Sequence, residues 1–198
     1  MEARRFDRDP MSVEEFLDWH QYQEERYELV QGTPVRMMTG ARQDHNLATA
    51  NVTVSLFAQL RGGGCRTTAS DTAVRTLTGV RYPDVTVDCG PFDAQALAAS
   101  APVLVVEVSS PSTRATDMHE KLDEYRATPG LRYVIQIEPT VIDVTLHERA
   151  ADDAAWAVRR HFYLSDVIRL PELNAELTLA DIYAGLSPAS RTPLHPVD

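Results

Sequence analysis

The stretch Pro102-Val-Leu-Val-Val-Glu-Val-Ser109 is a nearly continuous apolar run that a single acid interrupts. Such a run is typical of a central strand buried on both faces of a helix-covered sheet. An ionised carboxylate there is costly unless a metal ion, a cation or several donors compensate it. Glu107 lies near the carboxyl end of the strand, where such sheets place ligand sites. Glu107 is therefore a candidate site residue; the alternative is a structural glutamate bonded to backbone amides or to an arginine.

The patterns around this strand predict a mixed α/β (α+β) fold. A capping box at Ser12 to Glu15 begins a helix over 12–24, and a hairpin follows over 27–31 and 33–38. A helix over 43–61 ends at three glycines, and its apolar residues predict an inward face of Leu47, Val54, Leu56, Phe57 and Leu60. The other predicted strands are 66–69, 73–77, 81–88, 103–109, 132–138, 141–148 and 156–163, and the other helices are 113–127 and a short one from Thr178. This order of elements predicts a mixed β-sheet flanked by helices.

Length and composition predict a single domain that covers most of the chain. We expect a flexible N-terminus over 1–11, a single domain over 12–186 and a disordered tail over 187–198. No apolar run approaches the roughly 18 residues of a membrane span, and the start MEARRFDRDP lacks the apolar stretch of a secretory signal. We therefore expect a cytoplasmic protein with no membrane partner. Cys65 and Cys89 lie in no metal-binding pattern, which predicts two reduced thiols.

The charged residues are unevenly distributed. A net charge of −10 argues against a broad basic face for nucleic acid, although four cations gather in one short segment, at positions 114, 121, 126 and 132. The chain has 18 arginines and one lysine, Lys121. Lysine is a compact point charge, whereas guanidinium is planar and remains charged. The sole lysine is therefore a candidate functional residue, and chance is the alternative.

Two further elements place polar residues near Glu107. Tyr82-Pro-Asp-Val-Thr-Val-Asp88 puts Asp84 and Asp88 on one face of a strand, so each is a candidate partner for Glu107. The following helix places Asp117, Lys121 and Tyr125 at i, i+4 and i+8, hence on one face. A surface acid–lysine pair is the ordinary alternative. A short turn from 110 to 113 would fold this helix back so that its lysine reaches the carboxylates.

Together these residues resemble the core of the PD-(D/E)XK nucleases, and more closely the Uma-two family of bacterial proteins similar to restriction endonucleases. The resemblance runs in order from about residue 12 to residue 184. The matching residues are Tyr27-Glu28-Leu29-Val30-Gln31-Gly32, His45, Pro83-Asp84-Val85, Val106-Glu107-Val108-Ser109-Ser110-Pro111-Ser112-Thr113, Asp117, Lys121 and Tyr125. One position departs from the general motif, because Ser109 stands where lysine is expected. In members similar to this chain the following helix supplies the lysine, here Lys121.

The resemblance implies a restriction-endonuclease-like fold and a magnesium-dependent endonuclease that hydrolyses DNA. Asp84 and Glu107 would bind Mg²⁺, or Mn²⁺ as a substitute, with the backbone carbonyl of Val108 as a third ligand. Lys121 would orient the attacking water or stabilise charge on the phosphate. The supporting residues implied are Glu28, His45, Ser109, Asp117 and Tyr125.

Several alternatives stay open at this point. Glu28 is equally consistent with a surface position on an edge strand, and His45 with a helix-capping or surface histidine. The acidic net charge and the displaced lysine favour a second hypothesis, a catalytically inactive binding or assembly protein on the same scaffold. Exposed strands and an acidic surface also favour a homodimer.

Overall fold

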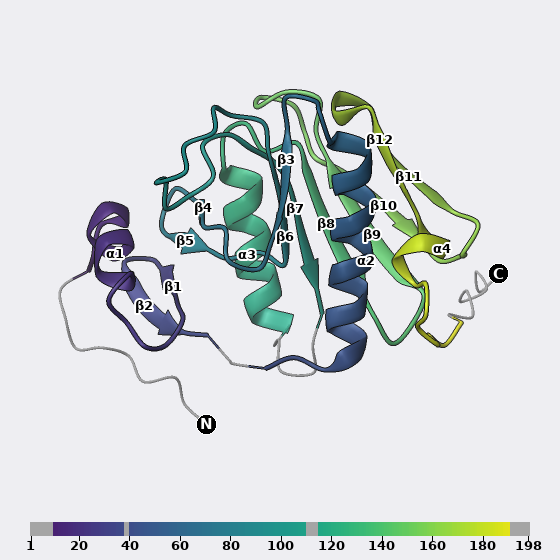
Figure 1. Ribbon diagram of the computed structural model, residues 1–198, viewed down its shortest axis with the longest axis horizontal. Coiled ribbons are helices and arrows are strands. Elements are labelled where there is room, and N and C mark those ends of the chain that lie inside the picture. Colours follow the sequence, from purple (N-terminus) through teal and green to yellow (C-terminus); the bar gives the residue numbers. More distant parts are fainter. Residues whose placement is uncertain (1–9, 38–39, 110–114, 191–198) are drawn as a thin grey trace.

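A computed structural model describes residues 10–37, 40–109 and 115–190, and of residues 115–117 it describes the backbone alone. Its centre is a six-stranded mixed sheet in the order β10-β9-β8-β7-β6-β3 (Figure 1). The strands, in chain order, are β3 (Arg66–Ala69), β6 (Val85–Asp88), β7 (Pro102–Val108), β8 (Tyr133–Glu138), β9 (Asp143–Glu148) and β10 (Ala157–His161). The predicted mixed sheet flanked by helices is thus confirmed.

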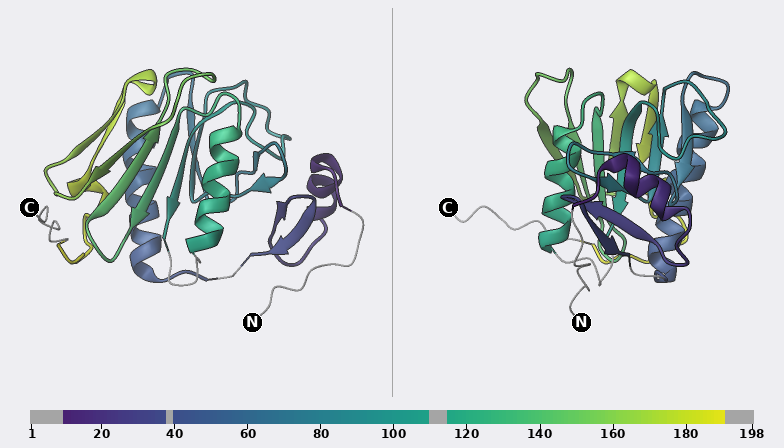
Figure 2. Two further views of the ribbon diagram at one scale, coloured as in Figure 1. Left: turned by 180° about the vertical axis from the view of Figure 1, so that it is seen from behind. Right: turned by 90° about the vertical axis from the view of Figure 1, so that its left-hand side faces the viewer.

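The apolar strand β7 lies inside this sheet, antiparallel to β6 and parallel to β8. Helix α2 (Gln43–Leu60) lies on one face of the sheet and α3 (Ala115–Ala127) on the other, as the side view in Figure 2 shows. Leu104, Val106 and Val108 belong to the core on the α2 side, and Val105 packs with α3 residues. Burial on both faces explains why this strand is apolar throughout except at Glu107.

The N-terminal residues form a smaller unit beside the central sheet (Figure 1). Helix α1 (Val13–His20) packs on a sheet of order β2-β1-β5-β4, made of β1 (Tyr27–Val30), β2 (Thr33–Arg36), β4 (Val74–Arg75) and β5 (Val80–Arg81). The capping box of Ser12 and Glu15 is confirmed, but the helix ends four residues before the predicted position 24. The strand predicted over 81–88 is divided into β5 and β6 at Pro83, because proline has no N–H to donate to a sheet.

The sequence patterns did not predict one hairpin near the C-terminus. Strands β11 (Val167–Leu170) and β12 (Ala175–Thr178) pair antiparallel on either side of a 3-10 turn (Pro171–Leu173), and the short helix α4 (Leu179–Ile182) follows. β12 and α4 pack on α2. The tail predicted to be disordered from residue 187 is bonded as far as Ala189, whose N–H donates to the Thr140 carbonyl. Residues 191–198 lie outside the described residues.

The predicted inward face of α2 was partly wrong. Leu56 and Leu60 are buried as expected, together with Ala48, Thr49 and Val52. Leu47, Val54 and Phe57 are 38%, 67% and 54% exposed. Apolar residues occur all round this helix, so the sequence alone did not define which stripe faces the sheet.

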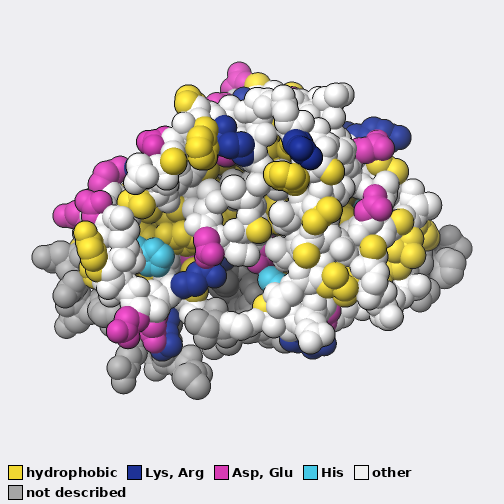
Figure 3. All heavy atoms as spheres, viewed as in Figure 1, with side chains coloured by type: hydrophobic (Ala, Val, Ile, Leu, Met, Phe, Trp, Pro, Cys, Tyr) yellow, Lys and Arg dark blue, Asp and Glu magenta, His cyan; other side chains and the backbone are white. Residues whose placement is uncertain are grey.

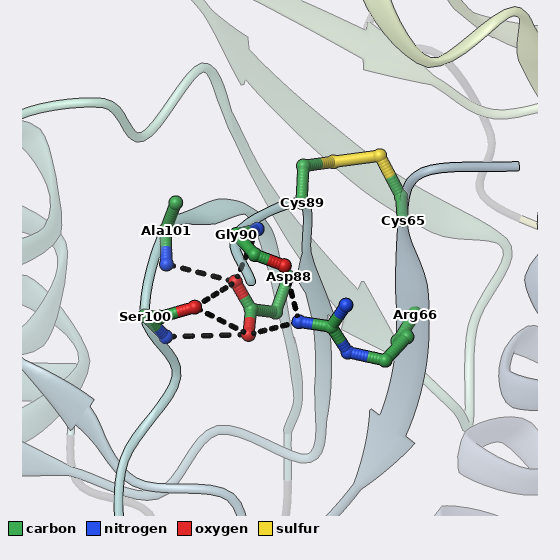
Figure 4. The surroundings of a disulfide bond; sticks show 7 residues. All are labelled: Cys65, Arg66, Asp88, Cys89, Gly90, Ser100 and Ala101. Atoms are coloured by element: carbon green, nitrogen blue, oxygen red, sulfur yellow. Dashed lines mark hydrogen bonds and ion pairs between the residues drawn. A yellow bond between two sulfur atoms is a disulfide. The ribbon is translucent and has the colours of Figure 1, made fainter. Parts of the chain in front are cut away.

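The two cysteines form a disulfide, so the prediction of reduced thiols was wrong (Figure 4). β3 pairs antiparallel with β6 so that Arg66 faces Asp88, which places Cys65 opposite Cys89. Their Cα atoms are 4.0 Å apart, although 24 positions separate them in sequence. Sequence spacing contains no information about this strand register, which is why the pair was missed.

No helix among the described residues has both the length and the apolar character needed to cross a membrane.

Candidate active site

Asp84 and Glu107 meet where β6 begins and β7 ends. In the antiparallel ladder Val85 pairs with Val106, so the next pair outward is Asp84 and Glu107. The Val108 N–H donates to Asp84 Oδ2 at 2.8 Å. N–H and C=O of one strand residue point to the same side, so the Val108 carbonyl also faces Asp84. Two carboxylates and a backbone carbonyl therefore lie at the same edge of the site.

Lys121 reaches the same place from α3. Its Nζ is 2.9 Å from Glu28 Oε1 and 3.7 Å from Glu107 Oε1. The lysine is only 8% exposed, although lysine is among the residues least often buried. The side chain therefore does not point into solvent, and the surface pair considered from the sequence is excluded for Lys121.

Glu107 is buried and lies in an electrostatic environment that disfavours its charge. Tyr125, one helical turn after Lys121, donates its hydroxyl proton to Glu107 Oε1 at 2.7 Å. Burial and the negative charges of Asp84 and Glu28 outweigh Lys121 and Tyr125, and they raise the pKa of Glu107 to about 7. A carboxylate with so high a pKa is short of positive charge around it.

Glu28 lies in the N-terminal hairpin but points into the site. It is 6% exposed, which excludes the surface position considered from the sequence. Its second oxygen, Oε2, accepts a hydrogen bond from Arg81 Nη1 at 3.0 Å. Burial opposes ionisation, but the charges of Lys121 and Arg81 prevail and lower the pKa of Glu28. Glu28 is thus an ionised link between the hairpin and the lysine.

Arg81 and Glu124 belong to this network, and the sequence analysis missed both. Arg81 is 1% exposed and donates from Nε and Nη2 to the two oxygens of Glu124, at 2.9 and 2.7 Å. A planar guanidinium can hold one carboxylate by two parallel hydrogen bonds while it bonds a second carboxylate, and an ammonium cannot make the bidentate contact. The only signals in the sequence were the position of Arg81 three residues before Asp84 and that of Glu124 one turn after Lys121.

His45 lies in the first turn of α2 and contacts the other side of Asp84. Its Nε2 is 3.3 Å from Asp84 Oδ1. The hydrogen bond with Asp84 opposes desolvation and raises the pKa of His45. His45 therefore orients a site carboxylate, rather than occupying the surface or capping position considered as an alternative.

Asp88, the rival of Asp84, lies at the opposite end of β6 (Figure 4). It accepts hydrogen bonds from Arg66 and from the backbone N–H groups of Gly90, Ser100 and Ala101. Burial opposes ionisation, but these donors lower the pKa of Asp88. Asp88 therefore holds a loop in place and lies away from Glu107.

Two supporting positions remain. Ser109 follows β7 and donates its backbone N–H to the Ile137 carbonyl at 2.7 Å. Asp117 belongs to α3, but its side chain lies outside the described residues, as does the turn predicted over 110–113. Figure 3 shows acidic, basic and histidine side chains around a hollow between the N-terminal unit and α2.

The composition of the site fits a divalent cation. Among the described residues, the site gathers four carboxylates, those of Glu28, Asp84, Glu107 and Glu124, and two permanent cations, Lys121 and Arg81. These cations contact Glu28, Glu107 and Glu124, whereas Asp84 is bonded to His45 and the Val108 N–H. Within the described ranges no three His, Cys, Asp or Glu side chains are arranged to hold a metal ion. Magnesium, however, needs only one or two protein carboxylates and keeps several waters. Asp84, Glu107 and the Val108 carbonyl supply such oxygen donors.

Comparisons with known proteins show the family and the fold of this chain. A protein of Synechocystis sp. (strain ATCC 27184 / PCC 6803 / Kazusa), "Uncharacterized protein slr1290", is 30% identical over 180 residues, which cover 89% of this chain and 93% of that protein. A crystal structure from Anabaena variabilis ATCC 29413, described as "a putative nuclease belonging to DUF820", superposes with a TM-score of 0.71 at 15% identity and covers 88% of this chain and 98% of that one. The sequence profile of the Uma2 family, described as "Putative restriction endonuclease", matches residues 13–181. The chain therefore belongs to the Uma2 family.

Proposed function

We propose that this protein is a magnesium-dependent endonuclease that hydrolyses phosphodiester bonds in DNA. The observation that carries the proposal is the convergence of Asp84, Glu107 and the buried Lys121 in a site where, among the described residues, the carboxylates outnumber the permanent cations. Membership of a family described as restriction endonucleases supports a nuclease-like activity. A divalent cation would compensate the acids at this site, and the buried ammonium of Lys121 would face the charge of a bound phosphodiester.

The residues would divide the work as follows. Asp84, Glu107 and the Val108 carbonyl would hold the cation, which supplies Lewis-acid stabilisation of charge on the phosphate. Lys121 would orient the attacking water or stabilise the charge that develops on a phosphate oxygen. Glu28 and Tyr125 fix the positions of Lys121 and Glu107 through bonds of 2.9 and 2.7 Å. His45 fixes the position of Asp84 through its contact with Oδ1.

Metal binding is tested by thermal unfolding with and without Mg²⁺ or Mn²⁺. We expect either ion to raise the Tm of the wild type, because a ligand bound by the folded state alone stabilises it. Asp84→Asn should abolish this rise. Asp88→Asn is the matched control: it removes a buried acid at the far end of β6, the strand that Asp84 precedes, so it should lower the starting Tm but keep the rise. An equal metal-induced shift in the Asp84 and Asp88 variants would refute the metal site.

Turnover is tested with supercoiled plasmid, linear duplex DNA, single-stranded DNA and RNA in the presence of Mg²⁺ or Mn²⁺. We expect cleavage of DNA that is lost in Glu107→Gln and in Lys121→Met. If the purified protein binds these substrates and leaves all of them intact, the catalytically inactive binding protein is the better description.

A further inference from the structure

A cavity lined by both polar and apolar side chains lies beside the candidate site, between α1 and the segment that leads into β6. Its volume is about 240 Å³, and its walls include His20, Arg26, Asp71 and Tyr82. None of these residues belongs to the site described above. The cavity is therefore a separate feature whose ligand can be inferred from its hydrogen-bonding groups.

The hydrogen bonds of His20 fix the direction of the bond to Tyr82. The Tyr27 N–H donates to His20 Nε2 at 3.1 Å, so Nε2 carries a lone pair. Burial and the charge of Arg26 lower the pKa of His20, so the ring is neutral and its one proton is on Nδ1. Nδ1 lies 3.0 Å from the Tyr82 hydroxyl oxygen. His20 is therefore the donor in this bond, and Tyr82 is the acceptor.

The Tyr82 hydroxyl consequently keeps a proton to donate. A phenol is protonated at neutral pH, since its ordinary pKa is about 10. Within the described part of the chain, no second hydrogen bond of this hydroxyl is present. A buried or half-buried hydroxyl normally finds partners for both roles. The cavity thus has a phenol donor that a ligand with an oxygen acceptor could use.

Arg26 adds a positive charge beside this donor. Its guanidinium lies 5.9 Å from the centroid of the Tyr82 ring, and its side chain is 41% exposed. One nitrogen of Arg26, Nη2, makes the contacts with both Asp71 and the Ser70 carbonyl. A guanidinium has five N–H donors on three nitrogens, so these two contacts involve only some of them. Asp71 is 81% exposed, so its ion pair is of the weak surface kind that an incoming anion can displace. A cation and a neutral O–H donor facing one hollow suit a phosphate group.

The cavity is linked directly to the candidate site. The Tyr82 N–H donates to Glu28 Oε1, the oxygen that also contacts Lys121. Tyr82 precedes Asp84 by two residues, which span roughly 7 Å of extended chain. A nucleic-acid strand whose scissile phosphate lay at Asp84 and Glu107 would carry another phosphate within reach of the cavity.

We infer that Arg26 and the Tyr82 hydroxyl bind a phosphate of the substrate strand. This phosphate is the neighbour of the scissile phosphate, at which the strand is cleaved. This inference rests on the proposed nuclease function and makes it more specific: the substrate is a polynucleotide strand, held at two successive phosphates. Arg26 and Tyr82 are binding residues, and the chemistry belongs to the neighbouring site.

The test is fluorescence anisotropy with a fluorescein-labelled single-stranded DNA of 20 nucleotides, without divalent metal, for four proteins. Tyr82→Phe removes only the hydroxyl, and Arg26→Gln removes the charge. Arg36→Gln is the matched control, because Arg36 is a half-exposed arginine of the same N-terminal unit with its own ion pair to Glu25. Melting curves of all four proteins establish that each one is folded.

We expect Arg26→Gln to raise Kd about tenfold, which corresponds to about 1.4 kcal/mol, and to reduce the slope of log K against log salt by about 0.7, the value for one phosphate of a single strand. Tyr82→Phe should raise Kd several-fold with an unchanged salt slope, because it removes no charge. Arg36→Gln should change Kd less than twofold. Equal Kd values for the Arg26, Arg36 and wild-type proteins would overturn the inference.

The two proposals fail in different ways. If Glu107→Gln abolishes DNA cleavage while the Arg26 and Tyr82 variants bind as the wild type does, the phosphate site is wrong and the nuclease stands. If these variants lose affinity but no condition gives cleavage or metal binding, the phosphate site stands and the nuclease is wrong.

Discussion

The Lys121 ammonium lies closer to Glu28 than to Glu107, at 2.9 Å against 3.7 Å. The lysine of α3 is therefore held primarily by the N-terminal hairpin. This contact joins two parts of the chain that are more than 90 positions apart, and it leaves Glu107 with less compensation than Glu28. The pKa values of the two acids are consequently shifted in opposite directions: that of Glu28 is lowered, and that of Glu107 is raised to about 7.

Replacing Lys121 by methionine should destabilise the fold in a pH-dependent way. Removing one partner of a buried ion pair costs roughly 3–5 kcal/mol when the other charges persist. Glu107 can take up a proton as the pH falls, so the loss should be smaller at pH 5.5 than at pH 8. Urea unfolding at both pH values measures the difference. Arg159→Met, at an exposed ion pair on β10, should show a small loss that does not vary with pH.

Glu107→Gln should stabilise the metal-free protein at alkaline pH. The folded pKa of about 7 lies above the ordinary 4.5, so the wild type loses stability as the pH rises from about 4.5 through 7. The full effect is on the order of 3 kcal/mol. The variant lacks this ionisation, so its free energy of unfolding should exceed that of the wild type at pH 8 and approach it at pH 4.5. Identical pH profiles for the two proteins would contradict the raised pKa.

Arg81→Met should be among the most damaging substitutions. It would leave Glu28 and Glu124 without the guanidinium that bridges them, at a cost of roughly 3–5 kcal/mol. Arg81→Lys should recover only part of the lost stability, because one ammonium cannot reproduce the bidentate contact with Glu124. Thermal unfolding compares both with Arg75→Met, which removes a half-exposed arginine from the neighbouring strand β4. A Tm for Arg81→Met as high as that of Arg75→Met would refute the structural role.

The disulfide should contribute substantially to stability. It closes a loop between residues 24 positions apart, which corresponds to roughly 3 kcal/mol in the chain-entropy description. The double variant Cys65→Ser/Cys89→Ser should therefore melt at a lower temperature. A reductant should lower the Tm of the wild type and leave that of the double variant unchanged. Alkylation of two thiols in the unreduced, denatured protein would show that the bond is absent.

Much of the candidate site could be predicted from local patterns. The apolar run around Glu107 identifies a central strand, because burial on both faces requires continuous apolar residues. The spacing of Lys121 and Tyr125 follows from helical geometry, which places i and i+4 on one face. Period-2 alternation puts Asp84 and Asp88 on the same side of their strand, but it cannot say which of them lies near Glu107. The register of β6 against β7 decides this in favour of Asp84.

The amino-acid sequence by itself determined the central strand, the helix that carries the sole lysine and the acids available to surround it. Only the tertiary structure decided that Arg81 bridges Glu28 and Glu124, that Cys65 meets Cys89, and which face of α2 is covered. The physical reason is range. Hydrophobic period and capping depend on residues within one or two turns of each other, whereas strand register and buried ion pairs depend on contacts between residues dozens of positions apart.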